Sequence, residues 1–290
     1  PANPSRSGVC VASVTGGTAE TGHESAAVKA GKDEEYGEVN ALNQLHSVRG
    51  HSDRAQFIIE EQTNIYPDTL CWVADFTYGF NEPLTENYFW HPAYDDYPVV
   101  GVSWKQAVAF CEWRTHYLNA YLDAKKRPQE SDFRLPTEAQ WEYAARGGRS
   151  QTMYPWGNYY PRNKKGCLMA NFKPGRGNYP EDGGFYTVRA DSYWPNDFGL
   201  YCMAGNVAEW TSTIYYEGRN NFQHDMNPDV RWNAKDDDPP LMKRKITRGG
   251  SWKDVAYFMQ NGTATYEYQD STKSYVGFRC VIDLPATSMK

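Results

Sequence analysis

Apolar and polar residues alternate over residues 103–125 with the spacing of an α-helix. The apolar positions recur mostly three or four residues apart, at Trp104, Ala107, Val108, Cys111, Tyr117, Leu118 and Tyr121. Ser103 precedes this repeat and Gln106 follows it by three residues, which is the spacing of a capping box. The pattern predicts a helix that starts after Ser103 and ends near Lys125–Arg127, before Pro128.

A second, shorter helix is predicted to follow Thr137. Gln140 again stands three residues after the capping residue, and Gly147 is typical of the position that ends a helix. We expect its buried stripe to consist of Trp141, Ala144 and Ala145.

Elsewhere the apolar residues form short runs between turn residues. Such runs predict short strands, at Cys71–Phe76, Tyr186–Arg189, Lys245–Arg248 and Val276–Ile282. Prolines among aromatic residues over 79–98 predict a structured loop, and the polar run 217–243 predicts a surface insertion.

Residues 1–55 differ in composition from the rest of the chain. They are rich in Gly, Ala, Ser and charged residues, and Tyr36 is their only aromatic residue. Such a segment buries too little apolar surface to offset its ordering entropy. We therefore divide the chain into residues 1–55, expected to be mobile or ordered by a partner, and a domain over residues 56–290.

Composition narrows the possible functions. Aromatic residues make up 15% of the 290 residues, which favours loop-rich packing around large rings. The formal net charge of -6 argues against a nucleic-acid partner, and no run of about 18 apolar residues occurs. The six cysteines are scattered without a C-x-x-C pair, so they indicate no zinc site.

Five short signatures occur in a fixed order through the second half of the chain. They lie at 134–148 (RLPTE to WEYAARGG), 154–158 (YPWGN), 199–210 (GLYCMAGNVAEW), 248–252 (RGGSW) and 277–280 (GFRC). Together they resemble the formylglycine-generating enzyme, or sulfatase-modifying factor, family. The resemblance implies an α+β fold: the formylglycine-generating-enzyme-like variant of the C-type lectin fold, loop-rich, with few short helices and antiparallel strands.

The resemblance also implies two structural calcium sites. Calcium takes carboxylate, amide and backbone carbonyl oxygens. The candidate ligands are Asn171, Phe172 and Asp182 in one site, and Gly205, Val207 and Glu209 in the other. Cys202 stands where the family usually has Asn, so the first site is favoured. Spacing alone would favour solvated turns over metal sites.

The catalytic chemistry of the family depends on copper held by two cysteines, which fits the preference of Cu(I) for soft thiolates. Aligned on Gly249–Trp252 and Gly277–Cys280, the two positions fall on Asp254 and Met259. The histidines are scattered, without a His-x-x-x-His pair that would indicate an iron site. These residues predict that the chain is not an enzyme and has no catalytic cofactor.

A finer resemblance points to the GldK/PorK family of gliding-motility lipoproteins, with the sister GldJ family as second choice. The segments that carry it are 66–72, 89–104, 234–239 and 266–270. It implies a non-catalytic structural subunit of the type IX secretion and gliding machinery. Such a subunit self-associates and forms a ring with a PorN/GldN-type partner and other outer-membrane secretion components. It lies in the periplasm, anchored to the outer membrane by a lipid that this chain lacks. We also expect a fragment whose sheet is completed by another piece of the protein or by another chain.

Two other functions remain open. One is a metal-dependent oxidoreductase of the formylglycine-generating family, with Asp254 and His91 or His224 as altered ligands. The other is a ligand- or glycan-binding module, because aromatic surfaces on a lectin-like fold can stack on sugars.

Overall fold

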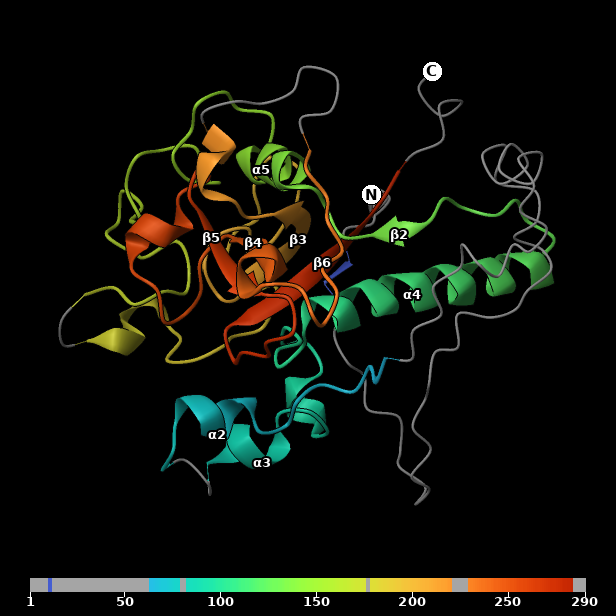
Figure 1. The fold of residues 1–290 in the computed structure, drawn as a ribbon. Coiled ribbons are helices and arrows are strands. Elements are labelled where there is room, and N and C mark those ends of the chain that lie inside the picture. The colour runs from blue at the N-terminus through green and yellow to red at the C-terminus, as the bar shows by residue number, and fades with distance from the viewer. Residues whose placement is uncertain (1–9, 12–62, 79–81, 176–177, 221–228, 284–290) are drawn as a thin grey trace, which may run out of the picture.

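The computed structural model describes residues 10–11, 63–78, 82–175, 178–220 and 229–283 (Figure 1). One six-stranded sheet has the order β1-β6-β3-β4-β5, and β2 also pairs with β6. The strands are β1 (Cys10–Val11), β2 (Phe133–Arg134), β3 (Ala208–Ile214), β4 (Arg244–Arg248), β5 (Ala264–Tyr268) and β6 (Val276–Ile282). The α-helices are α2 (Cys71–Asp75), α3 (Pro83–Asn87), α4 (Trp104–Ala124) and α5 (Glu138–Arg146). Short 3₁₀ turns occur at η3 (Pro92–Tyr94), η4 (Tyr179–Asp182), η5 (Glu217–Asn220), η6 (Pro240–Lys243) and η7 (Ala256–Met259).

Both predicted helices are confirmed. Ser103 and Thr137 each accept the backbone N–H of the Gln three residues on, and each Gln closes a capping box. The buried face of α4 differs from the prediction beyond Cys111, because Thr115 and Leu122 face the core. Tyr117 and Tyr121 are exposed. One end of α4 extends beyond the sheet (Figure 1).

The strand predicted at Cys71–Phe76 is wrong, because Cys71–Asp75 is the helix α2. The Asp68 carboxylate accepts the Leu70 N–H at 2.9 Å and so turns the chain into the helix. Cys71 and Trp72 are both buried, and they pack in one cluster with Tyr88 and Phe89.

The strand predicted at Tyr186–Arg189 is also absent from the described structure. Side-chain amides take the place of a partner strand here. The Asn171 amide donates to the Tyr186 carbonyl at 2.6 Å, and Asn206 accepts the Val188 N–H at 3.0 Å. The segment therefore satisfies its backbone groups without joining the sheet.

The other two predicted strands are confirmed as β4 and β6. The sequence prediction missed β3, which pairs antiparallel with β4 and parallel with β6 at the centre of the sheet. Its residues are mostly buried on both faces, so the polar–apolar alternation that marks a half-exposed strand is lacking.

The two predicted loop regions contain more structure than expected. Residues 79–98 include α3 and bury Tyr88, whose hydroxyl donates to the Pro98 carbonyl at 2.5 Å. The described part of 217–243 folds back onto the sheet, where Ala234 is buried and its carbonyl accepts from Gln269 at 2.8 Å. It is therefore not purely a surface insertion. The expectation for residues 1–55 lies outside the described residues, apart from β1, which pairs with β6.

The observed architecture has the predicted mixed α+β class. In the described part of the chain, no helix is long and apolar enough to cross a membrane.

Candidate functional site

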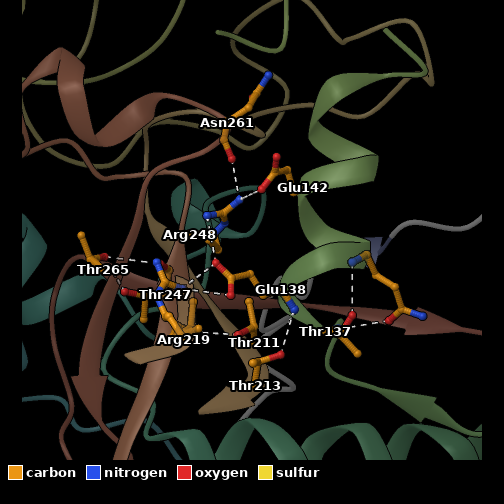
Figure 2. A network of polar contacts seen from close by, with 12 residues as sticks. Thr137, Glu138, Glu142, Thr211, Thr213, Arg219, Thr247, Arg248, Asn261 and Thr265 are labelled. Carbon is orange, nitrogen blue, oxygen red and sulfur yellow. Dashed lines mark hydrogen bonds and ion pairs between the residues drawn. The ribbon is translucent and has the colours of Figure 1, made fainter. Parts of the chain in front are cut away.

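A buried ionic network fixes α5 against β4 (Figure 2). The Arg248 side chain is 1% exposed and lies between two carboxylates of α5, at 3.2 Å from Glu138 and 2.5 Å from Glu142. It also donates to the Asn261 carbonyl, and Arg219 reaches Glu138 at 2.8 Å. The buried guanidinium of Arg248 therefore has two carboxylates and a carbonyl as partners of its terminal nitrogens, whereas its Nε has none. The end of β4 is held in place by these contacts.

The chain turns sharply directly after β4. Gly249 and Gly250 have φ values of +94° and +66°, which side-chain-bearing residues rarely adopt. A Cβ on Gly250 would also lie 2.9 Å from the Phe258 carbonyl carbon. The turn places Ser251 in the interior, where its N–H and hydroxyl donate to the Asp254 carboxylate at 2.9 and 2.6 Å.

Asp254 and Met259 occupy the two positions that the family resemblance assigns to copper-binding cysteines. The Asp254 carboxylate is engaged by Ser251, and the Asp254 carbonyl accepts the Lys173 N–H at 2.9 Å. Met259 is 1% exposed within an apolar cluster that contains Phe172. A hard carboxylate and one buried thioether do not match the soft thiolates that hold Cu(I), so these residues do not fit that copper site. Within the described residues, no group of three or more His, Cys, Asp or Glu could hold a metal ion.

The residues of the first predicted calcium site lie close together. The Asp182 carboxylate accepts the N–H groups of Phe172 at 2.8 Å and of Gly184 at 3.1 Å. Asn171 is buried, and its carbonyl accepts the Asn206 N–H at 2.8 Å. Burial raises the pKa of Asp182, although the hydrogen bonds from the backbone act in the opposite direction. Calcium binding at this position stays a prediction.

In the second predicted calcium site, the acidic side chain already has a cationic partner. Both oxygens of Glu209 accept from the Arg279 guanidinium at 2.5 Å, and the Trp141 indole donates at 2.6 Å. Gly205 and Val207 precede Glu209, and Gly205 packs against the backbone of Asn171. The carboxylate thereby joins β3 to β6 and α5. Calcium binding here also stays a prediction.

A cavity next to the Ser251 turn was not foreseen from the sequence. We call it the aromatic pocket. It has a volume of about 200 Å³ and is lined by Phe76, Phe172, Lys173, Tyr179, Phe185, Tyr186, Trp252 and Lys253. Trp252 stacks on Phe76 at a centroid distance of 5.8 Å and meets Tyr186 edge to face at 5.3 Å. These rings come from distant parts of the sequence, so no local pattern could have indicated the pocket.

Two of the residues that line the aromatic pocket are lysines, Lys173 and Lys253. The Lys173 ammonium lies 5.3 Å from the centre of the Tyr179 ring, and the Lys253 ammonium lies 3.0 Å from the centre of the Tyr275 ring. Tyr275 donates to Glu267 at 2.7 Å. Partial desolvation lowers the pKa of Lys253, whereas burial and the nearby carboxylate raise the pKa of Tyr275.

Comparisons with known proteins place the chain in a family. The model of the sulfatase-modifying factor enzyme 1-like domain matches residues 13–284. The formylglycine-generating enzyme of Bos taurus is 36% identical over 199 residues, covering 66% of this chain and 46% of the relative. That of Thermomonospora curvata is 34% identical, covering 65% of this chain and 56% of the relative. The inactive C-alpha-formylglycine-generating enzyme 2 of Bos taurus is also 34% identical, covering 64% of this chain and 50% of the relative.

The chain spans about half the length of the first curated relatives that it matches. Among solved structures, Treponema denticola variable protein 1 aligns with a TM-score of 0.47 and 26% identity, covering 64% of this chain and 71% of that one.

These relatives correct one prediction made from the sequence. The chain was predicted not to be an enzyme, but relatives of 34–36% identity are named formylglycine-generating enzymes. Asp254 and Met259 do occupy the positions assigned to the copper-binding cysteines. Their presence does not by itself exclude an enzyme. The fold prediction is confirmed by the family match and by the mixed α+β architecture with its single sheet. The chain belongs to the family of sulfatase-modifying factor enzyme 1-like domains.

Proposed function

We propose that this chain is a polypeptide-binding domain of its family, and that the aromatic pocket receives a side chain of the bound polypeptide. One observation carries the proposal. The wall of the pocket contains Trp252 and Lys253, which belong to the segment framed by the family signatures at Gly249 and Gly277. The pocket therefore adjoins the stretch that carries the chemistry in the resembled family.

The shape and chemistry of the pocket suit a planar or apolar side chain. Its rings already form one stacked pair and one edge-to-face pair, which are the two arrangements in which aromatic groups attract one another. A further ring can therefore pack against them in either way. Phe185 is 52% exposed and Tyr179 is 36% exposed, so a ligand can reach these rings from solvent. Large apolar groups on a fixed scaffold are typical of binding sites.

Phe185→Ala tests this proposal. We expect wild-type protein to bind fluorescently labelled peptides that contain Phe or Tyr. The variant should bind them roughly tenfold more weakly, because the loss of one ring contact reduces the binding free energy by about 1–2 kcal/mol. Tyr159→Ala is the matched control, because Tyr159 is 68% exposed and does not line the pocket. Fluorescence anisotropy measures the affinities. Equal affinities of wild type and the Phe185 variant would show that the aromatic pocket is not the peptide-binding site.

The names of the relatives favour formylglycine formation on a bound polypeptide as the activity. Mass spectrometry of cysteine-containing peptides after incubation with the purified protein, combined with metal analysis, tests this activity. Modified cysteine together with stoichiometric metal would establish an oxidoreductase whose metal donors differ from two cysteines. Unmodified peptides would restrict the function to binding.

The finer sequence resemblance supports a second candidate function. In this function the bound polypeptide is an assembly partner. The segments 66–72 and 89–104 support a subunit of type IX secretion that binds a PorN/GldN-type partner and copies of itself at the periplasmic face of the outer membrane. Size-exclusion chromatography of the chain with such a partner tests this candidate. Co-elution that Phe185→Ala abolishes would support it, and separate elution would count against it.

A further inference from the structure

We infer that two copies of this chain associate through α4, with the two helices antiparallel around a two-fold axis. The contact surface consists of Trp113, Tyr117, Ala120 and Ala124, and we call it the helical seam. None of these residues lines the aromatic pocket, so the inference is independent of the proposed peptide binding and goes beyond it.

The helical seam has the spacing of a helix–helix contact. Its four residues are four, three and four positions apart, as are the residues that face a partner helix in a coiled coil. All four are exposed, Trp113 to 40% and Tyr117 to 67%. The two rings stack on each other at a centroid distance of 5.3 Å, so they already form one continuous apolar surface. Such a surface is typical of a protein–protein contact.

The rest of the domain holds α4 from the opposite side. Thr115 and Leu122 are buried, and the Thr115 hydroxyl accepts the Phe133 N–H at 2.8 Å. The Asn119 side chain accepts the Glu130 N–H at 3.0 Å. One end of the helix extends beyond the sheet (Figure 1). The helix is thus formed and fixed within the single chain, so association does not require ordering it.

The order of large and small residues along the helical seam identifies a second copy as the occupant. The rings of Trp113 and Tyr117 come first, and the small residues Ala120 and Ala124 follow. A two-fold axis at the middle of the seam sets Trp113 against Ala124 of the second copy, and Tyr117 against its Ala120. Each contact then occurs twice, as a two-fold interface requires. Parallel helices would instead oppose ring to ring and alanine to alanine.

The charges on one flank of the seam also fit an antiparallel second copy. Glu112, His116, Asp123 and Lys126 follow one another along this flank as acid, base, acid and base. The same two-fold axis sets Glu112 opposite Lys126 of the second copy, and His116 opposite its Asp123. The series therefore matches itself with opposite signs when it is read in opposite directions, and such matching favours one partner and one orientation.

The other flank carries two cations, Arg114 and Lys125. The Arg114 guanidinium lies 4.6 Å from the centre of the Phe133 ring, and the Lys125 ammonium lies 5.7 Å from the centre of the Tyr121 ring. In the antiparallel pair, Arg114 comes opposite Tyr121 of the second copy. A cation therefore meets a ring, which attracts it.

The short length of the helical seam predicts a weak dimer. Residues 113–124 form about three helical turns. A contact of this length buries less than the roughly 1,200 Å² from which stable complexes begin. We therefore expect dimers to form at protein concentrations of tens of micromolar, on the order of 10⁻⁵ M.

Sedimentation equilibrium of the full chain tests the inference at concentrations from about 1 to 200 μM. Wild type should change from monomer to dimer over this range. Tyr117→Ala should raise the dissociation constant of the dimer at least about tenfold, because each dimer loses two ring contacts. Tyr143→Ala is the matched control. Tyr143 lies on α5, is 66% exposed and has the Phe198 ring 5.5 Å away, and its loss should leave the constant unchanged.

Ala120→Tyr distinguishes matched packing from general apolar adhesion. An added exposed ring would strengthen adhesion, but in the helical seam it collides with Tyr117 of the second copy and should weaken the dimer. An equimolar mixture of Tyr117→Ala and Ala120→Tyr sets a ring against an alanine at both contacts. The mixture should therefore form heterodimers, although each variant alone stays mostly monomeric. Both positions are exposed, so the thermal melts of the variants should match that of wild type.

Each outcome decides the inference. Wild type that stays monomeric over the whole range would overturn it, and so would a dimer that Tyr117→Ala leaves unchanged. A tighter dimer of Ala120→Tyr, or a mixture that associates no better than its components, would overturn the pairing of rings with alanines. None of these results bears on peptide binding by the aromatic pocket, which Phe185→Ala tests separately.

Discussion

Single residues show how this fold carries charge inside its core. Arg248 and Lys245 both lie on β4, and both side chains are essentially inaccessible to solvent. Arg248 is matched by the carboxylates of Glu138 and Glu142. The Lys245 ammonium instead lies 3.9 Å from the centre of the Trp104 ring and donates to the Trp232 carbonyl. Desolvation lowers the pKa of Lys245. The two residues should therefore respond differently to substitution.

Replacing Arg248 should strongly destabilise the domain. Arg248→Ala removes the buried guanidinium and its hydrogen bonds to Glu138, Glu142 and the Asn261 carbonyl. The two carboxylates keep Arg219 and Arg146 as partners, so we expect a cost of about 2–3 kcal/mol. Urea denaturation followed by tryptophan fluorescence measures this change. Arg149→Ala is the control, because its ion pair with Asp197 is exposed and should contribute at most about 1 kcal/mol. Equal losses in the two variants would contradict a special role of the buried network.

Lys245 should make stability depend on pH in the alkaline range. Desolvation lowers its pKa in the folded protein to about 8, whereas the ordinary value is 10.5. Between these values the unfolded chain binds more protons at this position, so the contribution of Lys245 to stability rises with pH. Below about pH 8 both states are protonated, and the cost of burying the charge is constant.

The comparison with Lys245→Met isolates this effect from other titrating groups. The stability of wild type relative to the variant should increase by ~3 kcal/mol between pH 8 and 10.5, as the shift implies. Denaturation curves collected across this range measure the difference. Parallel pH profiles for the two proteins would show that the lysine is not desolvated as described.

At the scale of elements, α4 and β6 form the central packing unit. Trp104, Ala107 and Cys111 of α4 lie in one apolar cluster with Phe278 and Cys280 of β6. The thiols of Cys111 and Cys280 are buried, and their sulfur atoms lie 3.4 Å apart. The hydrogen bond between them lowers the pKa of Cys280. Two elements far apart in sequence thus bring two thiols into contact.

Mild oxidation should link these elements. We expect oxidised glutathione, added in mild denaturant that transiently opens the buried cluster, to produce a Cys111–Cys280 disulfide, because the two sulfur atoms are adjacent in the folded domain. Closing so long a loop should stabilise the domain by roughly 4–5 kcal/mol in the chain-entropy model, and dithiothreitol should reverse the gain. Non-reducing peptide mapping and thermal melts measure the bond and its effect. Cys280→Ala should abolish both, whereas Cys167→Ala, which removes an exposed thiol, should not.

At the scale of the whole molecule, the aromatic pocket is assembled from segments that no single element contains. Phe76 follows α2, Phe172 and Tyr186 come from the irregular region before β3, and Trp252 follows β4. The buried network at Arg248 and the glycine turn fix the position of Trp252 against the sheet. Substitutions that loosen the network should therefore also weaken the peptide binding proposed for the pocket.

The sequence alone determined the features that depend on neighbouring residues. The capping boxes at Ser103 and Thr137 set the starts of α4 and α5, and Gly147 with its positive φ ends α5, because these interactions span only a few residues. The ordered signatures are also runs of neighbouring residues, so the sequence was sufficient to identify the family. Alignment on these signatures showed that Asp254 and Met259 stand at the positions of the family's copper-binding cysteines.

Only the tertiary structure decided the features that depend on distant partners. Cys71–Asp75 became a helix because Cys71 and Trp72 pack into a cluster with distant residues such as Val207. Tyr186–Arg189 stayed irregular because Asn171 and Asn206 satisfy its backbone. The engagement of Glu209 by Arg279 and the pocket with its two lysines likewise join groups that lie far apart in the sequence. Side-chain amides, guanidinium groups and rings act across such distances only after the chain has folded, which is why local patterns carry no record of them.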